Sequence, residues 1–224
     1  MSRSLPTALA LACTLFAASQ ASAADVRFSN FTNGYETVSI DVTAPEGHRT
    51  GSVAAGGLLA TLDGSASFTT YCIDVFESIS FGPTYSEYNV VAGAAHAFAN
   101  SDANADIGKL FAEGNTLDSA TRQAAFQIAI WEIAYETGAA YDLSAGSARF
   151  FGGSAATSGA LTLASSWLGA LPGVNQGYHL TVLESRGHQD QVTAVPEPST
   201  YVLMAAGLLG IGFIARRRTT QQQR

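Results

Sequence analysis

The sequence predicts an α+β domain in which an antiparallel β-sheet or barrel-like layer packs against a segregated layer of helices. In the first half of the chain, apolar and polar side chains alternate over several stretches, as they do in half-buried strands. The middle of the chain changes to the three-to-four-residue period of helices, and a late stretch alternates again. Strands, then helices, then a returning strand are typical of domains with separate β and α layers.

The strands are predicted from alternation and from the turn residues between them. Residues 38–42 alternate between valine or isoleucine and polar side chains, and turn residues follow at 45–47. Asp63 and Gly64 predict a hairpin, because this pair readily adopts the positive φ angles of a two-residue turn. The predicted strands cover residues 26–42, 58–62, 67–75, 85–91 and 178–184.

Helix starts and stops are marked by capping residues. Asp118 or Ser119 is expected to cap the best-defined helix, which Gly138 ends. Gly114 closes the helix before it, and Pro172 ends the last one. The predicted helices cover residues 94–100, 103–113, 119–137 and 160–171.

Residues 1–23 are expected to be a secretory signal peptide rather than part of the fold. A single cation, Arg3, precedes an apolar stretch at residues 5–18, and the small residues at 21–23 follow. This order is typical of a signal peptide that is cleaved before Ala24.

Residues 195–224 are predicted to contain a second membrane-directed segment. An uncharged run of about 15 residues, 201–215, precedes a triple arginine at 216–218. The run is slightly shorter than the roughly 18 residues of a transmembrane helix, which favours temporary retention. Cationic ends stay in the cytoplasm, so residues 24–194 are expected outside the inner membrane. The alternative, an integral protein with two membrane helices, is disfavoured because both apolar runs are short.

The tail resembles the PEP-CTERM sorting signal of Gram-negative bacteria. The residues that carry this resemblance are Val195, Pro196, Glu197 and Pro198, followed by the apolar segment and by Arg216, Arg217 and Arg218. The resemblance implies recognition by an exosortase, a membrane protease that would release the exported domain near Pro196 to Pro198. It also implies transient anchoring in the inner membrane, and then association with exopolysaccharide or biofilm at the cell surface or in the extracellular matrix.

The composition of residues 24–194 excludes several classes of function. The segment is long enough for one domain with a sizeable core. It carries 6 basic and 17 acidic side chains, and Lys109 is the only lysine of the whole chain, so nucleic acid is not expected as a partner. The histidines lack metal-ligand spacing, and neither a phosphate-binding loop nor a nucleophile elbow is found. The sequence therefore predicts no metal, no cofactor and no enzyme active site.

Cys72 is the one cysteine that remains once the predicted signal peptide, with Cys13, is removed. In an oxidising compartment a lone cysteine is expected to be buried and inert, paired with another chain, or used chemically. Its aromatic and β-branched neighbours indicate a buried strand. Gln127 lies on the same side of the best-defined helix as Trp131, so its amide is expected to point into the core.

Two motifs resemble the thioester domain of bacterial surface adhesins. They are Tyr71-Cys72-Ile73-Asp74 and, after residues 107–110, Phe126-Gln127-Ile128-Ala129-Ile130-Trp131. That family pairs an aromatic-Cys-aliphatic strand with a Thr-Gln-x-Ala-Ile/Val-Trp helix, and Phe126 stands here in place of the threonine. The resemblance implies a bond between the Cys72 sulfur and the side-chain carbonyl of Gln127. The implied pocket residues are Tyr71, Asp74, Ala129 and Trp131.

A thioester would be an activated acyl group that survives only while water is kept away from it. The implied nucleophile is an amine, such as a lysine of a partner protein, or a sugar hydroxyl, and an amine would end as an amide on Gln127. This coupling occurs once and is not enzymatic turnover. The expected role is adhesion or attachment in extracellular polymer.

Two alternatives need no thioester. In the first, the chain is a noncovalent matrix- or carbohydrate-binding module with the same tail. Cys72 is then a buried core residue, and Gln127 makes a hydrogen bond to a strand carbonyl. In the second, Cys72 forms a disulfide between chains.

Several titratable residues lie close to the two motifs. Asp74, Glu77, Glu132 and Glu136 are expected to form a solvated acidic face, since no calcium-binding loop accompanies them. His96 is expected to be structural or exposed. It could act as a general base only if it packs near Cys72.

Overall fold

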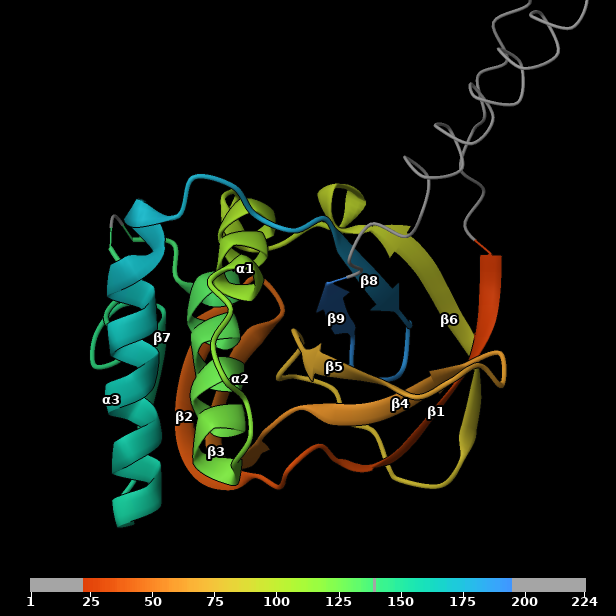
Figure 1. Ribbon diagram of the computed structural model, residues 1–224, viewed down its shortest axis with the longest axis horizontal. Helices are drawn as coiled ribbons and strands as arrows, with labels where there is room; N and C mark the ends of the chain where they lie inside the picture. The colour runs from red at the N-terminus through yellow and green to blue at the C-terminus, as the bar shows by residue number, and fades with distance from the viewer. Residues whose placement is uncertain (1–21, 139, 195–224) are drawn as a thin grey trace, which may run out of the picture.

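The computed structural model describes residues 22–138 and 140–194, which form two lobes packed side by side (Figure 1). One lobe is a closed antiparallel barrel of six strands. The other combines a three-stranded antiparallel sheet with three α-helices. The mixed α and β class and the antiparallel, barrel-like layer predicted from the sequence are therefore confirmed.

The barrel brings together strands from both ends of the domain. In order around it, they are β1 (Ser22–Phe31), β4 (Leu58–Leu62), β5 (Phe68–Cys72), β9 (Gln191–Ala194), β8 (Leu180–Glu184) and β6 (Thr84–Ala92). The sheet of the second lobe has the order β3 (Gly47–Ala55), β2 (Glu36–Ala44) and β7 (Ala148–Phe151). β5 pairs with the last strand, so that Cys72 lies opposite Gln191.

The turns explain which of the predicted strands the structure confirms and which are wrong. Asp63 and Gly64 have φ angles of 49° and 69°, so the predicted hairpin between β4 and β5 is confirmed. The single strand expected over residues 26–42 is wrong, because the chain turns at Asn33 and Gly34, with φ angles of 57° and 89°. β1 therefore enters the barrel, whereas β2 joins the second lobe. The sequence does not predict β3, β7 or β9.

Three of the four predicted helices are present: α1 (Ala103–Ala112), α2 (Ala120–Tyr135) and α3 (Ala155–Ala170). The helix expected over residues 94–100 is wrong, since only a 3₁₀ turn forms there, at Gly93–Ala95. α3 begins five residues earlier than expected. The reason is Ser154, whose hydroxyl oxygen caps the helix by accepting a hydrogen bond from the backbone N–H of Thr157 at 3.0 Å.

α2 is the central element of the second lobe. Ser119 caps its N-terminus by accepting a hydrogen bond from the backbone N–H of Arg122. Every residue from Gln123 to Tyr135 is buried, because the helix contacts α1, α3 and strands from both lobes. In Figure 1, α2 lies between α3 and the barrel. A polar side chain at any of these positions must therefore find its partners inside the protein.

Glu132 and Glu136 of α2 are such side chains, and the solvated acidic face expected for them is wrong. Glu132 is fully buried and Glu136 is 3% exposed. The Glu132 carboxyl accepts a hydrogen bond from the backbone N–H of Asp142 at 2.7 Å, and Glu136 accepts one from Ser147 at 2.9 Å. These carboxyls hold the connection between α2 and β7 against the helix. Asp74 and Glu77 are half-buried.

The predicted processing segments lie mostly beyond the described part of the chain. The C-terminal transmembrane segment is outside it, and so is the signal peptide up to residue 21. β1 starts at Ser22, so the expected cleavage point before Ala24 falls within this strand. Among residues 22–138 and 140–194, no helix combines the length and apolarity needed to cross a bilayer.

Glu132→Gln is expected to remove a pH dependence of stability. Burial raises the pKa of Glu132 from the usual 4.5 to about 8, so the folded protein keeps a proton that the unfolded chain has released. The free energy of unfolding of the parent should therefore fall as the pH rises from about 4.5 to about 8. The variant is permanently neutral and should be more stable than the parent at pH 8, by roughly 1–3 kcal/mol.

Urea denaturation of both proteins between pH 4 and pH 9 measures this difference. The free energies of unfolding of the parent and the variant should be close at the acidic end of the range and should differ increasingly as the pH rises. Parallel profiles would contradict a protonated carboxyl at this position.

Candidate functional site

Cys72 and Gln127 meet where the barrel touches the second lobe. Cys72 is the last residue of β5, and Gln127 lies in the middle of α2. The backbone N–H of Cys72 donates to Gln127 Oε1 at 2.9 Å, and Gln127 Nε2 donates to the backbone oxygen of Cys72 at 2.7 Å. Both residues are buried, with 3% and 1% of their surface exposed. The carboxamide is therefore held against the cysteine by two hydrogen bonds away from water.

The Cys72 sulfur has two polar contacts of its own. It donates a hydrogen bond to the backbone oxygen of Asp74 at 2.9 Å, and it accepts one from the indole N–H of Trp131 at 3.4 Å. Burial raises the pKa of the Cys72 thiol, although the Trp131 hydrogen bond acts in the opposite direction. The thiol is thus protonated at neutral pH, with an N–H donor in place to stabilise negative charge on the sulfur.

The ring of Trp131 is also in contact with an aromatic ring of the second lobe. Its ring stacks parallel to the ring of Phe150 in β7, with the ring centroids 6.3 Å apart. Trp131 comes one helical turn after Gln127, so the two side chains extend from the same side of α2. Helix register and ring stacking together place the indole N–H on the sulfur.

Tyr71, the neighbour of Cys72, supports the site from within the core. Its hydroxyl donates to Gln123 Oε1 at 2.8 Å, and its ring packs against Phe126 with a centroid distance of 4.7 Å. Phe126 also contacts Phe111 and Trp167 by its ring edges. Phe126 therefore fills the core beside the Gln127 side chain and does not compete for its hydrogen bonds.

A partly enclosed pocket of about 360 Å³ reaches this pair. Cys72, Gln127 and Trp131 form part of its wall. The rest comes from β1, β3, the start of β4 and the connections β3–β4, β5–β6 and β8–β9, and includes Arg49 and Phe81. Phe81 is 40% exposed, so the wall that includes the two buried residues also includes a solvent-exposed aromatic ring.

The remaining predicted pocket residues lie elsewhere. The Asp74 carboxylate accepts hydrogen bonds from the backbone N–H groups of Phe76 and Glu77 and lines a different pocket of about 320 Å³. Ala129 is fully buried in α2, and neither it nor Tyr71 is part of the wall of the 360 Å³ pocket. The sorting residues Pro196, Glu197, Pro198, Arg216, Arg217 and Arg218 lie outside the described part of the chain.

His96 is not brought to Cys72. Its Nδ1 lies 2.6 Å from Glu184 Oε1, its ring packs on Phe98, and it lines the same pocket as Asp74. The contact with Glu184 makes it structural, as the sequence predicts. Within residues 22–138 and 140–194, no group of three or more His, Cys, Asp or Glu side chains could hold a metal ion.

Sequence reasoning missed several residues of this site. Gln123 holds the Tyr71 hydroxyl, and the backbone oxygen of Asp74 holds the thiol. Arg49 reaches the pocket from β3, a strand that the sequence does not predict. Of these residues, only Gln123 could have been predicted from the sequence. It precedes Gln127 by one helical turn and therefore lies on the same side of the helix.

Comparison with known proteins gives one sequence-motif match and one structural match. Residues 194–218 match the PEP-CTERM protein-sorting motif, which confirms the resemblance of the tail and implies export with transient membrane anchoring. A solved structure, the N-terminal thioester domain of the fibronectin-binding protein SfbI from Streptococcus pyogenes, matches with a TM-score of 0.45 and 16% identity. The match covers 76% of this chain and 98% of that chain. No curated protein matches the sequence.

Gly57→Ala is expected to disturb the packing of β5 on α2. A Cβ atom at this position would lie 2.5 Å from Gln123 Oε1, 2.8 Å from Thr69 Cγ2 and 3.1 Å from Tyr71 Cε1. Overpacking of this kind costs about 1–3 kcal/mol, which urea denaturation would show as a lower midpoint. Gly153→Ala is the matched control, because no atom lies within 4 Å of its added Cβ. Equal stability of the two variants would contradict the tight contact at residue 57.

Proposed function

We propose that the Cys72 sulfur and the Gln127 side-chain carbonyl form an internal thioester, and that the exported protein uses it to attach to extracellular polymer. The observation that carries the proposal is the buried carboxamide of Gln127, which two hydrogen bonds hold against Cys72. Proximity on rigid elements is what this reaction needs, because no separate catalyst brings the groups together.

Thioester formation exchanges one bond of the Gln127 carboxamide. The Cys72 sulfur attacks the side-chain carbonyl carbon, and the new C–S bond replaces the C–N bond. The nitrogen leaves as ammonia and takes the thiol proton with it. Because burial raises the pKa of the thiol, this step is expected to be slow, and it needs to happen only once in the life of the protein.

Coupling to a partner reverses the exchange with a new amine. The amine nitrogen attacks the Gln127 carbonyl carbon, the C–S bond breaks, and the proton lost by the nitrogen returns to the Cys72 sulfur. The partner is then joined to Gln127 through an amide. Trp131 supports this step, because its indole N–H can stabilise the charge that develops on the departing sulfur.

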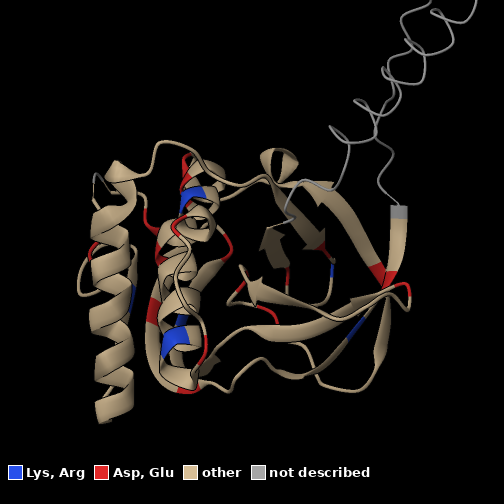
Figure 2. Cartoon of the chain, in the orientation of Figure 1, with Lys and Arg blue, Asp and Glu red and all other residues tan. Residues whose placement is uncertain are grey.

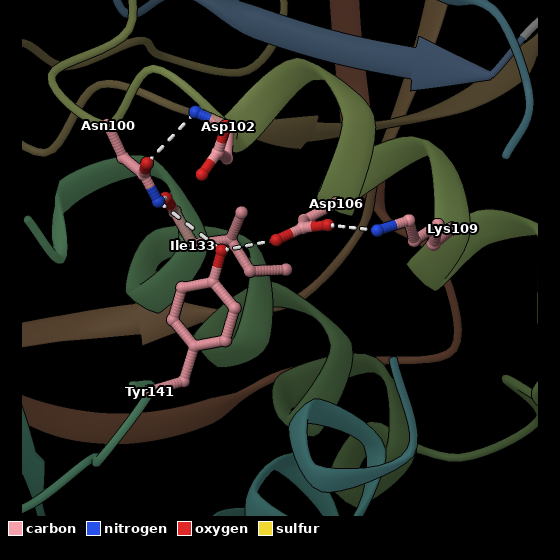
Figure 3. Close-up of polar contacts among 6 residues, drawn as sticks. All are labelled: Asn100, Asp102, Asp106, Lys109, Ile133 and Tyr141. Carbon is pink, nitrogen blue, oxygen red and sulfur yellow. Dashed lines mark hydrogen bonds and ion pairs between the residues drawn. The ribbon is translucent and has the colours of Figure 1, made fainter. Parts of the chain in front are cut away.

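The domain contains little that would compete for its own thioester. Basic side chains are sparse on both lobes (Figure 2), and Lys109 is the only lysine of the sequence. Its ammonium group lies 2.7 Å from Asp106 Oδ1, and the Tyr141 hydroxyl donates to the other oxygen of the same carboxylate (Figure 3). This ion pair holds the lysine amine against a carboxylate of its own helix, α1.

The sorting motif indicates where in the cell this chemistry would take place. It implies exosortase as the processing partner, with the inner membrane as a temporary anchor. We propose that the released domain acts in adhesion or attachment in the exopolysaccharide of a biofilm, by single-turnover coupling rather than as an enzyme. A noncovalent matrix- or carbohydrate-binding module is the competing proposal, because a structural glutamine could also make the two hydrogen bonds to Cys72.

The mature protein is expected to weigh one ammonia less than its sequence requires. Methylamine should add to it at Gln127, and intact-mass spectrometry with peptide mapping measures both changes. Cys72→Ala should abolish both, because the variant has no sulfur to form the bond. A protein of full mass, whose thiol titrates after unfolding, would instead favour the noncovalent module.

Replacement of both Pro196 and Pro198 by alanine is expected to block release from the inner membrane. The reason is that exosortase recognition is expected to depend on this motif. Membrane fractionation with immunodetection follows the protein, and Thr219→Ala, just beyond the matched residues 194–218, is the control that should be released normally. Normal release of the double variant would count against exosortase processing.

A further inference from the structure

We propose that the acceptor coupled at Gln127 is an amine carried on a sugar ring, and that an exposed aromatic cluster positions that ring at the pocket. The cluster consists of Phe31, Tyr35 and Phe81. This inference rests on the proposed thioester and adds the class of acceptor and the residues that select it.

The aromatic cluster is unusually exposed for its size. Phe31 lies 4.5 Å from Tyr35 and 5.2 Å from Phe81, measured between ring centroids. Tyr35 is 49% exposed and Phe81 is 40% exposed. In the described part of the chain the large exposed apolar side chains are Tyr35, Phe81, Phe151 and Tyr178, so two of the four belong to this cluster. Such a concentration of aromatic surface marks a binding site.

The cluster and the reactive pair share one pocket. Phe31 and Phe81 line the same 360 Å³ pocket as Cys72 and Gln127. Gly56 lies directly beneath the rings, where an added Cβ would be 3.1 Å from Tyr35 Cβ and 3.2 Å from Phe31 Cδ1. Phe31 and Tyr35 therefore pack on backbone that leaves no room for a side chain at residue 56.

The polar part of the wall matches a sugar better than an alkyl amine. Arg49, Glu77 and Gln189 bring a cation, an anion and an amide to the pocket, and Ser52 and Ser78 add hydroxyl groups. This mixture of donors and acceptors with opposed charges suits the hydroxyl groups of a sugar. A lysine side chain has a single polar group, its terminal amine, to offer to this wall.

The aromatic rings suit the apolar faces of the same ligand. An aromatic face carries partial negative charge, and the C–H groups on one side of a sugar ring carry partial positive charge, so the two attract each other. The wall thus offers polar groups for the edge of the ring and aromatic surface for its face. That combination is typical of a small-ligand pocket, where a few polar groups fix the orientation.

The chemistry of the coupling also favours a sugar amine. The nucleophile must be unprotonated, and an ordinary lysine, with a pKa near 10.4, is almost entirely protonated at neutral pH. The hydroxyl groups next to a sugar amine withdraw electrons and lower its basicity, so more of it is free to react. Its nitrogen would displace the Cys72 sulfur from the Gln127 carbonyl carbon, with the nitrogen's proton passing to the sulfur.

The test compares coupling rates of four probes with the mature protein. They are methyl 2-amino-2-deoxyglucopyranoside, its N-acetylated form, methylamine, and a lysine blocked at both ends. Mass spectrometry follows the adduct at Gln127 in the parent and in Phe81→Ala. Each rate constant is divided by that of the parent for the same amine, so that differences in amine basicity cancel.

Phe81→Ala is expected to slow coupling of the amino sugar about tenfold, on the scale of one lost aromatic contact, with less than a twofold effect on methylamine. Tyr35→Ala should act in the same direction. Phe151→Ala is the control, because Phe151 is 52% exposed on β7 and lies outside this pocket, and it should change neither rate. The N-acetylated sugar should not couple.

Two results would overturn the inference while leaving the thioester in place. One is equal slowing of the sugar and the lysine probe, or no slowing of either. The other is labelling by methylamine without any labelling by the amino sugar. If methylamine itself fails to label the parent, the thioester is absent, and the proposed function falls together with the inference.

Discussion

The two hydrogen bonds between the Gln127 carboxamide and the Cys72 backbone are the contact on which the arrangement of the site depends. They join the middle of a buried helix to the end of a barrel strand. Breaking them would leave polar groups unpaired in the core, at about 1–3 kcal/mol for each group. The helix and the strand therefore keep a fixed register, and the Gln127 carboxamide stays against the Cys72 backbone.

The same burial acts in opposite directions on the two stages of the proposed chemistry. Removal of water protects an activated acyl group, but it also raises the pKa of the thiol that must form it. Trp131 and the Asp74 backbone oxygen are the groups that moderate this conflict, since one donates to the sulfur and the other accepts from it. A slow formation step is compatible with a bond that is made only once.

The elements with strong local signals could be predicted, and those defined by tertiary contacts could not. Ser119, Asp63 and Gly64 mark α2 and the hairpin through their own backbone preferences, so the sequence places Cys72 on a strand and Gln127 on a helix, as the structure does. β7 and β9 have only four residues each, too few to show a period. Glu132 and Glu136 look like surface residues until the connection to β7 covers them.

The final strand sets how close the domain lies to the membrane. β9 ends at Ala194, where the match to the sorting motif begins, so only six residues separate the barrel from the uncharged run. The residues between this strand and the uncharged run, 195–200, reach at most about 20 Å when fully extended. The transient anchoring that the motif implies would therefore keep β9 within this distance of the uncharged run, whereas Cys72 of β5 pairs with Gln191, at the end of β9 farther from the motif. Cleavage within residues 195–200 would remove this short tether without removing any strand of the barrel.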